Sequence, residues 1–467
     1  MKNFLISLIF PAIISGSITA QNVDFAEANG SPINVGTTSL RGFASADLNN
    51  DGIKDFIIGN AYDNTLSIFL GIGNGQFSPA NGSPLTIAGG PIYTVISDFN
   101  NDLIPDFATA NYEGGNISIK LGTGNGTFVN GPTPSITTGD MAYCIDAIDF
   151  NADGKKDIVT VSVFTNKAYV LLGDGAGNFS PSTGTPYSTG SKPSHVSAGF
   201  FNSDSNPDFV VANSNSSSIS VFLGEGNGSF TEAADSPFEA GEEPRTFSVN
   251  DINNDSRNDL IVANGTGDDV SVFLGEDNGT FTEAANSPFA TGQYAYQTAI
   301  ADLNSDGKLD FAVTNGLDNE VWFLLGNGAG SFVNATNSPM SVGTNPQPIC
   351  TDDFNGDNKP DLLIGDYQGE NVTVLLNKNS VGISEINTAD AVVIFPNPAN
   401  DEVRIHLDNF EKGLILVLFN SAGQEVDRLS LVSEETFYQR EDLAKGIYMF
   451  GIYKGADILG NGNIIFE

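Results

Sequence analysis

The sequence predicts an all-β protein in which a seven-bladed β-propeller is followed by a small C-terminal β-sandwich. The first observation is a period: one aspartate-rich pattern begins seven times, at intervals of 51 residues, at Asp47, Asp98, Asp149, Phe200, Asp251, Asp302 and Asp353. The second is that each repeat holds four short segments with the alternation of β-strands. A strict period indicates a repeat architecture, and four-stranded antiparallel sheets arranged radially are the blades of a propeller.

The fifth repeat shows the four segments clearly. Thr246 to Asn250 alternates before the aspartate-rich loop, residues 259–263 follow it, residues 270–274 come next, and Phe281 begins the fourth segment. Turn residues such as Asn264-Gly265 separate the segments. Because no repeat contains a segment that reads as a long helix, a helical solenoid is excluded.

The two ends of the repeat region predict how the ring closes. Residues 375–378 end the seventh repeat without its fourth strand, whereas residues 25–32, ahead of the first loop, match residues 281–288. We therefore expect the N-terminal segment to complete the seventh blade, which removes an open sheet edge. The other copies carry a Phe 30 residues after the pattern begins, which marks the fourth strand: Phe77, Phe128, Phe179, Phe230, Phe281 and Phe332.

The aspartate-rich loops predict calcium sites. Six copies read Asp-x-Asn-x-Asp-x-x-x-Asp, which places side-chain oxygens at positions 1, 3, 5 and 9 of a tight loop, with a backbone carbonyl near position 7. An EF-hand is disfavoured, because position 12 is apolar, as at Ile58 and Val262, rather than Glu. The alternative is that these residues only form turns. We expect the calcium to be structural and to fix the geometry of each blade.

Together with Leu-Gly, Asn-Gly-x-Phe and Ser-Pro signals at fixed offsets, these loops make residues 22–378 resemble the FG-GAP/VCBS repeats of integrin-type propellers, in which a calcium loop joins the first and second strands of a blade. The resemblance implies about six structural Ca²⁺ sites. Their ligands would be Asp47, Asn49, Asp51 and Asp55; Asp98, Asn100, Asp102 and Asp106; Asp149, Asn151, Asp153 and Asp157; Asp251, Asn253, Asp255 and Asp259; Asp302, Asn304, Asp306 and Asp310; and Asp353, Asn355, Asp357 and Asp361.

Two loops depart from this pattern. In the fourth, Phe200 occupies the first ligand position and leaves Asn202, Asp204 and Asp208, so the sequence predicts weak or no binding there. In the second, Leu103 stands at position 6, where Gly suits a left-handed backbone, which disfavours that site.

The composition is strongly acidic. The chain has 57 Asp and Glu against 19 Lys and Arg, a formal net charge of −38. Bound calcium would cancel much of the repulsion, so we expect the metal-free protein to be less stable than the loaded one. The charge also argues against nucleic acid, anionic lipid and polyanionic polymers as main partners.

The N-terminal residues 1–20 read as a secretory signal peptide cut after Ala20. Lys2 is followed by an apolar run from Phe4 to Ile14 and then by small and polar residues. No other segment reaches about 18 consecutive apolar residues, so no transmembrane segment is expected in the mature protein.

The period ends at Lys378, residues 379–391 read as a polar linker, and residues 392–467 form a separate domain. Its Pro396-Asn397-Pro398 opening, residues 420–424 and residues 445–448 resemble the C-terminal sorting domain of the type IX secretion system, a small β-sandwich. The resemblance implies export by the type IX machinery to the outer cell surface of a Gram-negative bacterium or to the medium. Basic residues are missing after Lys454, where such domains often have them, and the alternative is an appended adhesive sandwich.

Histidine chemistry gives little support to catalysis. The chain has only His195 and His406, too few for a histidine-based triad or zinc cluster, and no catalytic residue is assigned. A carbohydrate-active enzyme, either a polysaccharide lyase or a glycosidase, remains the alternative, because such enzymes can work with Lys, Arg, Tyr and carboxylates.

Binding is the preferred function, and the candidate surface is the propeller face opposite the aspartate loops. Side chains there vary between repeats while the framework does not, as in a scaffold that displays different groups. Aromatic and Arg side chains suit an extracellular protein or glycan ligand, although Tyr at a strand start can simply pack. The turns after the second strands present Tyr62, Tyr112, Phe164 and Tyr367, and the first strands start with Arg41, Tyr93, Tyr143, His195, Arg245, Tyr296 and Gln347.

Overall fold

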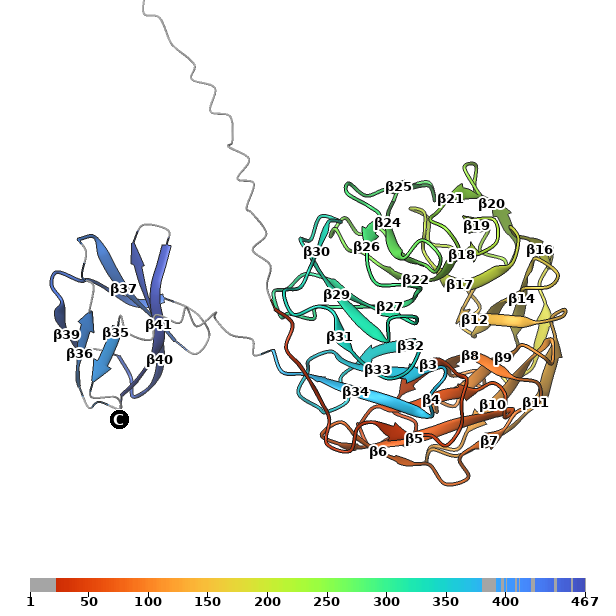
Figure 1. Cartoon of the computed structure of the whole chain (residues 1–467), viewed down its shortest axis with the longest axis horizontal. Coiled ribbons are helices and arrows are strands. Elements are labelled where there is room, and N and C mark those ends of the chain that lie inside the picture. Colours follow the sequence, from red (N-terminus) through yellow and green to blue (C-terminus); the bar gives the residue numbers. More distant parts are fainter. Residues whose placement is uncertain are drawn as a thin grey trace, which may run out of the picture. The chain divides into compact units, whose positions relative to one another are not determined.

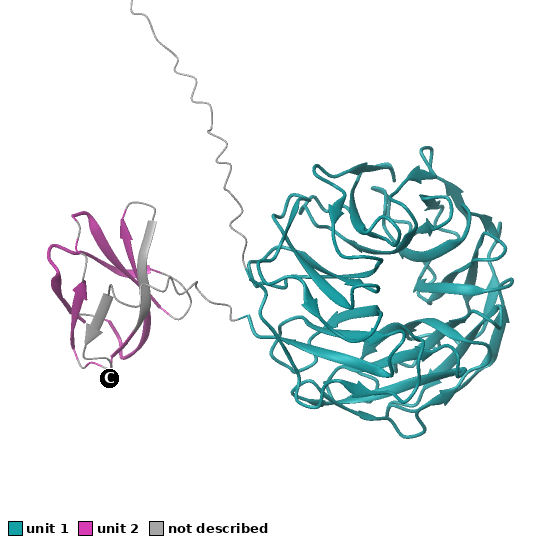
Figure 2. Ribbon diagram, viewed as in Figure 1, with its two compact units in different colours: residues 1–379 teal, residues 380–467 magenta. Residues whose placement is uncertain are grey.

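The computed structural model divides the chain into two compact units, Met1–Asn379 and Ser380–Glu467 (Figures 1 and 2). It describes residues 22–379, 392–395, 399, 401–407, 410, 412–420, 425–440, 443–454 and 457–466. The predicted signal peptide, residues 380–391 of the predicted linker and the Pro396-Asn397-Pro398 motif lie outside these residues. Nowhere in the described residues is there a helix long and apolar enough to cross a membrane.

The first unit is a ring of seven antiparallel sheets, which confirms the predicted propeller (Figure 1). In each sheet the first strand lies innermost and contacts the first strands of both neighbouring blades, and the last contacts the first, which closes the ring. The first strands are β3 (Leu40–Ala46), β8 (Pro91–Ser97), β12 (Ala142–Ile148), β17 (Pro193–Gly199), β22 (Pro244–Asn250), β27 (Ala295–Ala301) and β32 (Pro346–Asp352).

The second strands are buried along their whole length, which explains their nearly continuous apolar sequences. They are β4 (Asp55–Asn60), β9 (Asp106–Asn111), β13 (Asp157–Ser162), β18 (Asp208–Asn213), β23 (Asp259–Asn264), β28 (Asp310–Asn315) and β33 (Asp361–Asp366). The third strands are β5 (Thr65–Gly73), β10 (Asn116–Gly122), β14 (Lys167–Gly173), β19 (Ser218–Gly224), β24 (Asp269–Gly275), β29 (Glu320–Gly326) and β34 (Asn371–Asn377).

The outer edge of the blades differs from the predicted single fourth strand. Six blades carry two short pieces there, both paired with the third strand, because the chain turns at a Ser-Pro or Thr-Pro pair between them. At this break the Ser or Thr hydroxyl oxygen accepts a hydrogen bond from a backbone amide of the third strand, as Ser236 does from Val221 at 2.8 Å. The first pieces are β6 (Gln76–Pro79), β15 (Phe179–Pro181), β20 (Phe230–Glu232), β25 (Phe281–Glu283), β30 (Phe332–Asn334) and β1 (Phe25–Glu27); the second are β7 (Leu85–Thr86), β16 (Tyr187–Ser188), β21 (Phe238–Glu239), β26 (Phe289–Ala290), β31 (Met340–Ser341) and β2 (Ile33–Asn34).

The second blade is the exception at this edge. Its outer strand β11 (Phe128–Thr137) runs on without a break and shifts register against β10 between Ser118 and Lys120. The sequence there has Gly131 and two prolines in place of the Ser-Pro turn.

The predicted closure is confirmed. The N-terminal strand β1 pairs antiparallel with β34 of the seventh blade, in the register Phe25 to Asn377, and the red N-terminal segment lies beside the blue β34 (Figure 1). Phe25 is 7% exposed, and its ring stacks on Phe323 of the sixth blade at a centroid distance of 5.1 Å. The first residues after the predicted signal peptide therefore join the apolar core between two blades.

The second unit has two sheets that share one apolar core, which confirms the small β-sandwich. One sheet orders β35 (Val392–Phe395), β36 (Glu402–Leu407) and β39 (Glu435–Gln439); the other orders β38 (Glu425–Ser430), β37 (Leu414–Phe419), β40 (Gly446–Lys454) and β41 (Asp457–Phe466). Val403 and Ile405 from the first sheet pack with Leu416, Ile452 and Phe466 from the second.

Replacement of Phe25 by Ala is expected to lower the free energy of unfolding of the propeller by roughly 3–5 kcal/mol, because it removes a buried ring from the closure. Thermal or denaturant unfolding measures the change. Phe164→Ala is the matched control, since that ring is 66% exposed and should cost little. Equal stability of the two variants would contradict the role of the N-terminal strand in closing the ring.

Candidate functional site

The first aspartate loop connects β3 to β4, as predicted, and its side-chain oxygens bind its own backbone. The two carboxylate oxygens of Asp47 accept hydrogen bonds from the amides of Asp51 at 3.1 Å and Gly52 at 2.8 Å. The side-chain oxygen of Asn49 accepts the Asp51 amide at 3.0 Å, and one Asp51 oxygen accepts the Ile53 amide at 2.8 Å. These bonds draw the oxygens at positions 1, 3 and 5 into one tight turn.

Five further loops repeat this arrangement, including the second loop that the sequence disfavoured. All six have positive φ at positions 4 and 6. Leu103 takes φ of 66° and leaves its side chain 88% exposed, so no packing conflict opposes the left-handed backbone, at a cost of about 1–2 kcal/mol. The backbone of the second loop therefore matches the other five, and weaker calcium binding there stays a prediction.

The fourth loop differs, in agreement with its departure from the pattern. Phe200 offers no oxygen at position 1, and no residue from 200 to 208 has a positive φ. What remains is the pair of bonds from the amide of Asp204 to the Asn202 side chain at 2.9 Å and from the amide of Asn206 to Asp204 at 2.7 Å.

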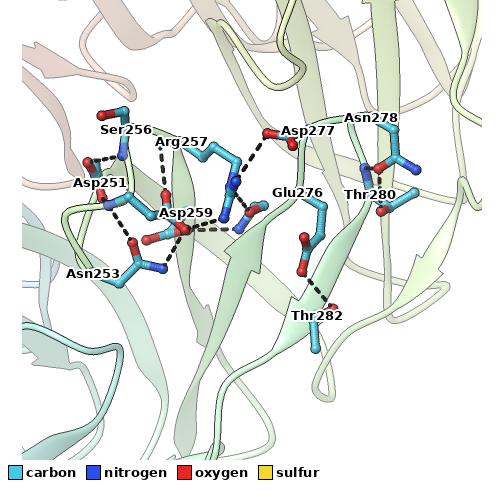
Figure 3. A network of polar contacts seen from close by, with 12 residues as sticks. Asp251, Asn253, Ser256, Arg257, Asp259, Glu276, Asp277, Asn278, Thr280 and Thr282 are labelled. Carbon is cyan, nitrogen blue, oxygen red and sulfur yellow. Dashed lines mark hydrogen bonds and ion pairs between the residues drawn. The ribbon is translucent and has the colours of Figure 1, made fainter.

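In the fifth loop an arginine side chain forms ion pairs with one of the loop's own carboxylates and with a neighbouring turn, which the sequence analysis missed (Figure 3). Arg257, at position 7, contacts the Asp255 carboxylate at 2.7 Å and the Asp277 carboxylate at 3.1 Å, and its Nε donates to the Gly275 carbonyl at 2.9 Å. Lysines at the same position pair more loosely in the third and seventh loops, Lys155 with Asp153 at 3.3 Å and Lys359 with Asp357 at 3.5 Å. The sequence signal was the basic residue at position 7.

The aspartate at position 9 has a role that needs no metal. Asp55 begins the second strand, is fully buried, and accepts the amide of Leu48 in the loop at 2.7 Å and the amide of Gly71 in the third strand at 2.7 Å. All seven blades repeat the pair of bonds at 2.7–3.0 Å, from the residue at position 2 and from the end of the third strand, to Asp55, Asp106, Asp157, Asp208, Asp259, Asp310 and Asp361.

Burial raises the pKa of these carboxyls well above the ordinary 3.8, to about 6 for Asp55 and about 7 for Asp310. The two backbone hydrogen bonds oppose that shift by favouring the charged form. Among the described residues, no three His, Cys, Asp or Glu side chains are gathered as a metal cluster. The position-9 aspartates, assigned as calcium ligands from the sequence, are thus bonded to the strands and bridge the loop, the second strand and the third strand.

On the opposite face a cavity of about 280 Å³ opens among the first strands and the turns. We call it the central cavity, because the blades on both sides of the ring contribute to it. Of the residues predicted to form the binding face, it is lined by Arg41, Tyr62, Tyr112, Tyr143, Arg245 and Tyr367. The cavity also includes Lys192 and Glu113, which the sequence analysis missed; each lies within two residues of a predicted one or of a strand start.

Arg41 lies at the centre of this group. Its guanidinium donates to the Tyr296 hydroxyl at 2.5 Å and to the Gln347 side-chain oxygen at 2.7 Å, and it stacks on the Tyr367 ring at 4.2 Å from the centroid. The Tyr367 and Tyr62 hydroxyls are 3.3 Å apart. These contacts join the first, sixth and seventh blades around one positive charge.

Three predicted face residues pack beneath the cavity instead of lining it. Tyr296 and Tyr93 are 4% and 7% exposed, and the His195 ring contacts both Tyr93 and Phe247, at centroid distances of 5.7 and 4.6 Å. Burial lowers the pKa of His195 to about 3, so this imidazole is neutral at ordinary pH. Packing is therefore the role the structure gives to Tyr93, His195 and Tyr296.

Two further predicted residues also lie outside the lining. Phe164 is 66% exposed on its turn, whereas Gln347 is buried and holds Arg41. Tyr93 and His195 are one residue out of register with the others, because the 51-residue period from Arg41 falls on Ile92 and Ser194, and Ile92 does line the cavity. Successive side chains of a strand point to opposite faces, so a difference of one residue agrees with the packing of Tyr93 and His195 away from the cavity.

Comparison with known proteins identifies both units. The FG-GAP-like repeat family matches residues 47–109, 98–160, 201–262, 251–313 and 302–364, together more than half of the chain. The secretion system C-terminal sorting domain matches residues 393–464. The second match confirms the predicted sorting domain, and the chain is exported through type IX secretion.

A curated relative and two solved structures resemble parts of the chain. Beta-agarase A from Zobellia galactanivorans is 37% identical over 59 residues, 13% of this chain and 11% of that protein. BBS1N, crystallised in complex with ARL6DN, has a TM-score of 0.54 at 13% identity, over 78% of this chain and 99% of that one. A putative 6-phosphogluconolactonase from Bacteroides fragilis has a TM-score of 0.51 at 16% identity, over 69% and 86%. At these identities the two structures show the fold alone.

Replacement of Asp208 by Asn is expected to lower the free energy of unfolding by about 1–3 kcal/mol, because the amide cannot accept both the Phe201 and the Gly224 backbone N–H groups and leaves one buried donor unpaired. The fourth blade is chosen because its loop lacks the first calcium ligand. Unfolding in the presence of a chelator measures the effect, and Asp204→Asn, at an exposed position of the same loop, is the control. If both variants were as stable as the parent, the bridging role of position 9 would be refuted.

Proposed function

The chain belongs to the FG-GAP-like repeat family and carries a secretion system sorting domain, and on this premise we propose that it is an adhesion or ligand-binding module that recognises a glycan or protein at the central cavity. The observation that carries the proposal is the convergence of aromatic and basic side chains from several blades on one cavity. Recognition sites commonly combine a concave surface with a few placed polar groups and aromatic rings.

The construction of the face supports this function. Every blade repeats the same first three strands and the same aspartate bridge, yet the equivalent position at the start of the first strand varies between Arg, Ile, Tyr, Ser and Gln. Tyr62 is 67% exposed at the cavity margin, where a large aromatic ring has no packing role to explain it. A rigid ring with variable side chains at one end is suited to binding.

We propose further that six of the seven loops hold structural Ca²⁺. The donors at positions 1, 3 and 5 are all oxygens, and each carboxylate oxygen that accepts one hydrogen bond keeps a second lone pair for a cation. When bound, calcium supplies positive charge to a chain with a net charge of −38. The fourth loop, without an oxygen at position 1, is left out of the proposal.

Type IX export would deliver the mature protein to the outer surface of a Gram-negative bacterium or to the medium, where it meets extracellular ligands. The residues after the predicted signal peptide, such as Phe25, are built into the ring, and the sorting domain is a separate compact unit. Removal of either predicted targeting segment would therefore leave the propeller core intact.

A carbohydrate-active enzyme is the second candidate, because one carboxylate, Glu113, lines the cavity beside Tyr112 and Lys192. Glycosidases generally use two carboxylates, and the lining supplies only one. His195 is neutral and packed below, which removes it as an acid or base at ordinary pH. The residues around the cavity thus favour binding over hydrolysis.

Chelation of calcium is expected to lower the melting temperature, and by more at about pH 7 than at about pH 5. Each loop occupied at 100 times its Kd adds about 2.7 kcal/mol. The buried carboxyl of Asp259 has its pKa raised to about 6 from 3.8, so the metal-free fold holds a proton that the unfolded chain releases. That stability is fully present below about pH 4 and is lost as the pH rises through 6, where calcium compensates. Thermal unfolding with EDTA or calcium measures both effects, and an unchanged melting temperature on chelation would refute the sites.

The double variant Tyr62→Ala/Tyr112→Ala is expected to weaken ligand binding at least tenfold and to lower the melting temperature only slightly, because both rings line the cavity, Tyr62 is exposed and Tyr112 is only partly buried. The ligand is first found on glycan and protein arrays with the calcium-loaded chain. Phe164→Ala, on an equivalent turn outside the cavity, is the control. Binding that survives the double variant would place the site elsewhere, and turnover of a polysaccharide would favour the enzyme.

A further inference from the structure

We propose that the central cavity binds an anionic saccharide, a sugar whose carboxylate or sulfate group is held by Arg41, Arg245 and Lys192. The inference rests on the proposed function and names the class of ligand. An anionic ligand is not what the composition of the chain predicts, because its negative net charge disfavours polyanionic partners.

The charge inside the cavity is opposite to that of the chain. Three of the 19 basic side chains line it, and Glu113 is the one acidic residue among its lining residues. Arg245 is paired with Glu243 at 3.1 Å. When Glu113 and Glu243 are both counted against the three basic side chains, the cavity keeps a net charge of +1, whereas the whole chain has −38. A local positive site within a negative surface concentrates the field on a single small anion.

Arg41 has no acidic partner. The structure pairs its guanidinium only with neutral groups, the Tyr296 hydroxyl, the Gln347 amide oxygen and the Tyr367 ring, and gives it no ion pair among the described residues. In a chain with 57 carboxylates, an arginine packed among tyrosines without one is unusual. An uncompensated charge in such surroundings is costly, and a bound anion would offset that cost.

The geometry of the two arginines favours a planar or tetrahedral oxyanion. Hydrogen bonds to Tyr296 and Gln347 and the contact with the Tyr367 ring hold the Arg41 guanidinium, and a fork of N–H donors matches carboxylate and sulfate oxygens. Arg245 lies over Tyr294 and Tyr296, and its buried Nε has no hydrogen-bond partner. Both arginines are therefore held by aromatic faces, which limits the ordering that binding requires.

The rest of the lining favours a sugar over a peptide or a free anion. Tyr62, Tyr112, Tyr143 and Tyr367 offer aromatic faces for the apolar side of a sugar ring, together with hydroxyl groups for its polar edge. A volume of about 280 Å³ is at the small end for ligand sites, which suits one sugar unit. The net charge of −38 would repel a long polyanion, so we expect the charged unit to be a terminal or isolated one.

Titration calorimetry with the calcium-loaded full chain tests the inference, using galacturonate against its methyl ester and galactose sulfate against galactose. We expect the charged member of at least one pair to bind at least tenfold more tightly than its neutral partner, and to weaken as salt is raised. Arg245→Gln/Lys192→Gln should reduce that affinity at least tenfold and leave the neutral partner unaffected. Lys120→Gln, on β10 where Lys120 donates to Asn130, removes one positive charge outside the cavity lining; it is the control for loss of charge and should change nothing.

The other outcomes overturn the inference in distinguishable ways. Equal binding of charged and neutral members, with loss of both in Tyr62→Ala/Tyr112→Ala, would refute the anionic ligand and leave the proposed binding function standing. If inorganic sulfate bound as tightly as the sulfated sugar, or an acidic peptide bound more tightly than both charged sugars, the assignment of the ligand as a saccharide would be refuted. If neither charged sugar bound, the inference would be refuted. The glycan and protein arrays would still test the proposed binding function independently. A melting temperature equal to that of the parent shows that the Gln variants are folded.

Discussion

The propeller depends on one buried interaction, the carboxylate that begins each second strand and accepts backbone amides from the preceding loop and from the third strand. Asp55 shows it in the first blade, where Leu48 and Gly71 are the donors. A buried carboxylate is costly unless its oxygens are bonded, and a buried amide is costly unless it is paired, so each group satisfies the other. The bridge ties three successive segments of a blade together at the end that carries the aspartate loop.

Because the same bridge recurs seven times, the opposite end of each blade is free to vary. There the first, third and fifth blades place Arg41, Tyr143 and Arg245 at one cavity, while Tyr93 and Tyr296 are buried beneath it. Ring closure matters as well, since Tyr62 and Tyr367 meet at 3.3 Å across 305 residues of sequence. The proposed binding site is therefore a product of the closed ring rather than of any single blade.

The distribution of charge follows the same division. The seven aspartate loops at one end hold 20 of the 57 acidic side chains, and hydrogen bonds from the backbone and the proposed calcium ions offset their repulsion. At the other end, Arg41 and its tyrosines form a site without a carboxylate partner. An overall charge of −38 is thus a poor guide to the local field at the cavity, because fields in a protein are set by the nearest groups.

The amino-acid sequence by itself determined the number of blades, the place of the aspartate loops and the closure by residues near Phe25, because these follow from spacing along the chain and from local strand and turn chemistry. It also identified the sorting domain. It did not reveal that the outer strand breaks at its proline, that Asp208 and its equivalents bond to the strands, or that His195 is packed while Lys192 lines the cavity. Only the tertiary structure decided these points, because burial and ring closure bring together residues that are far apart in the sequence.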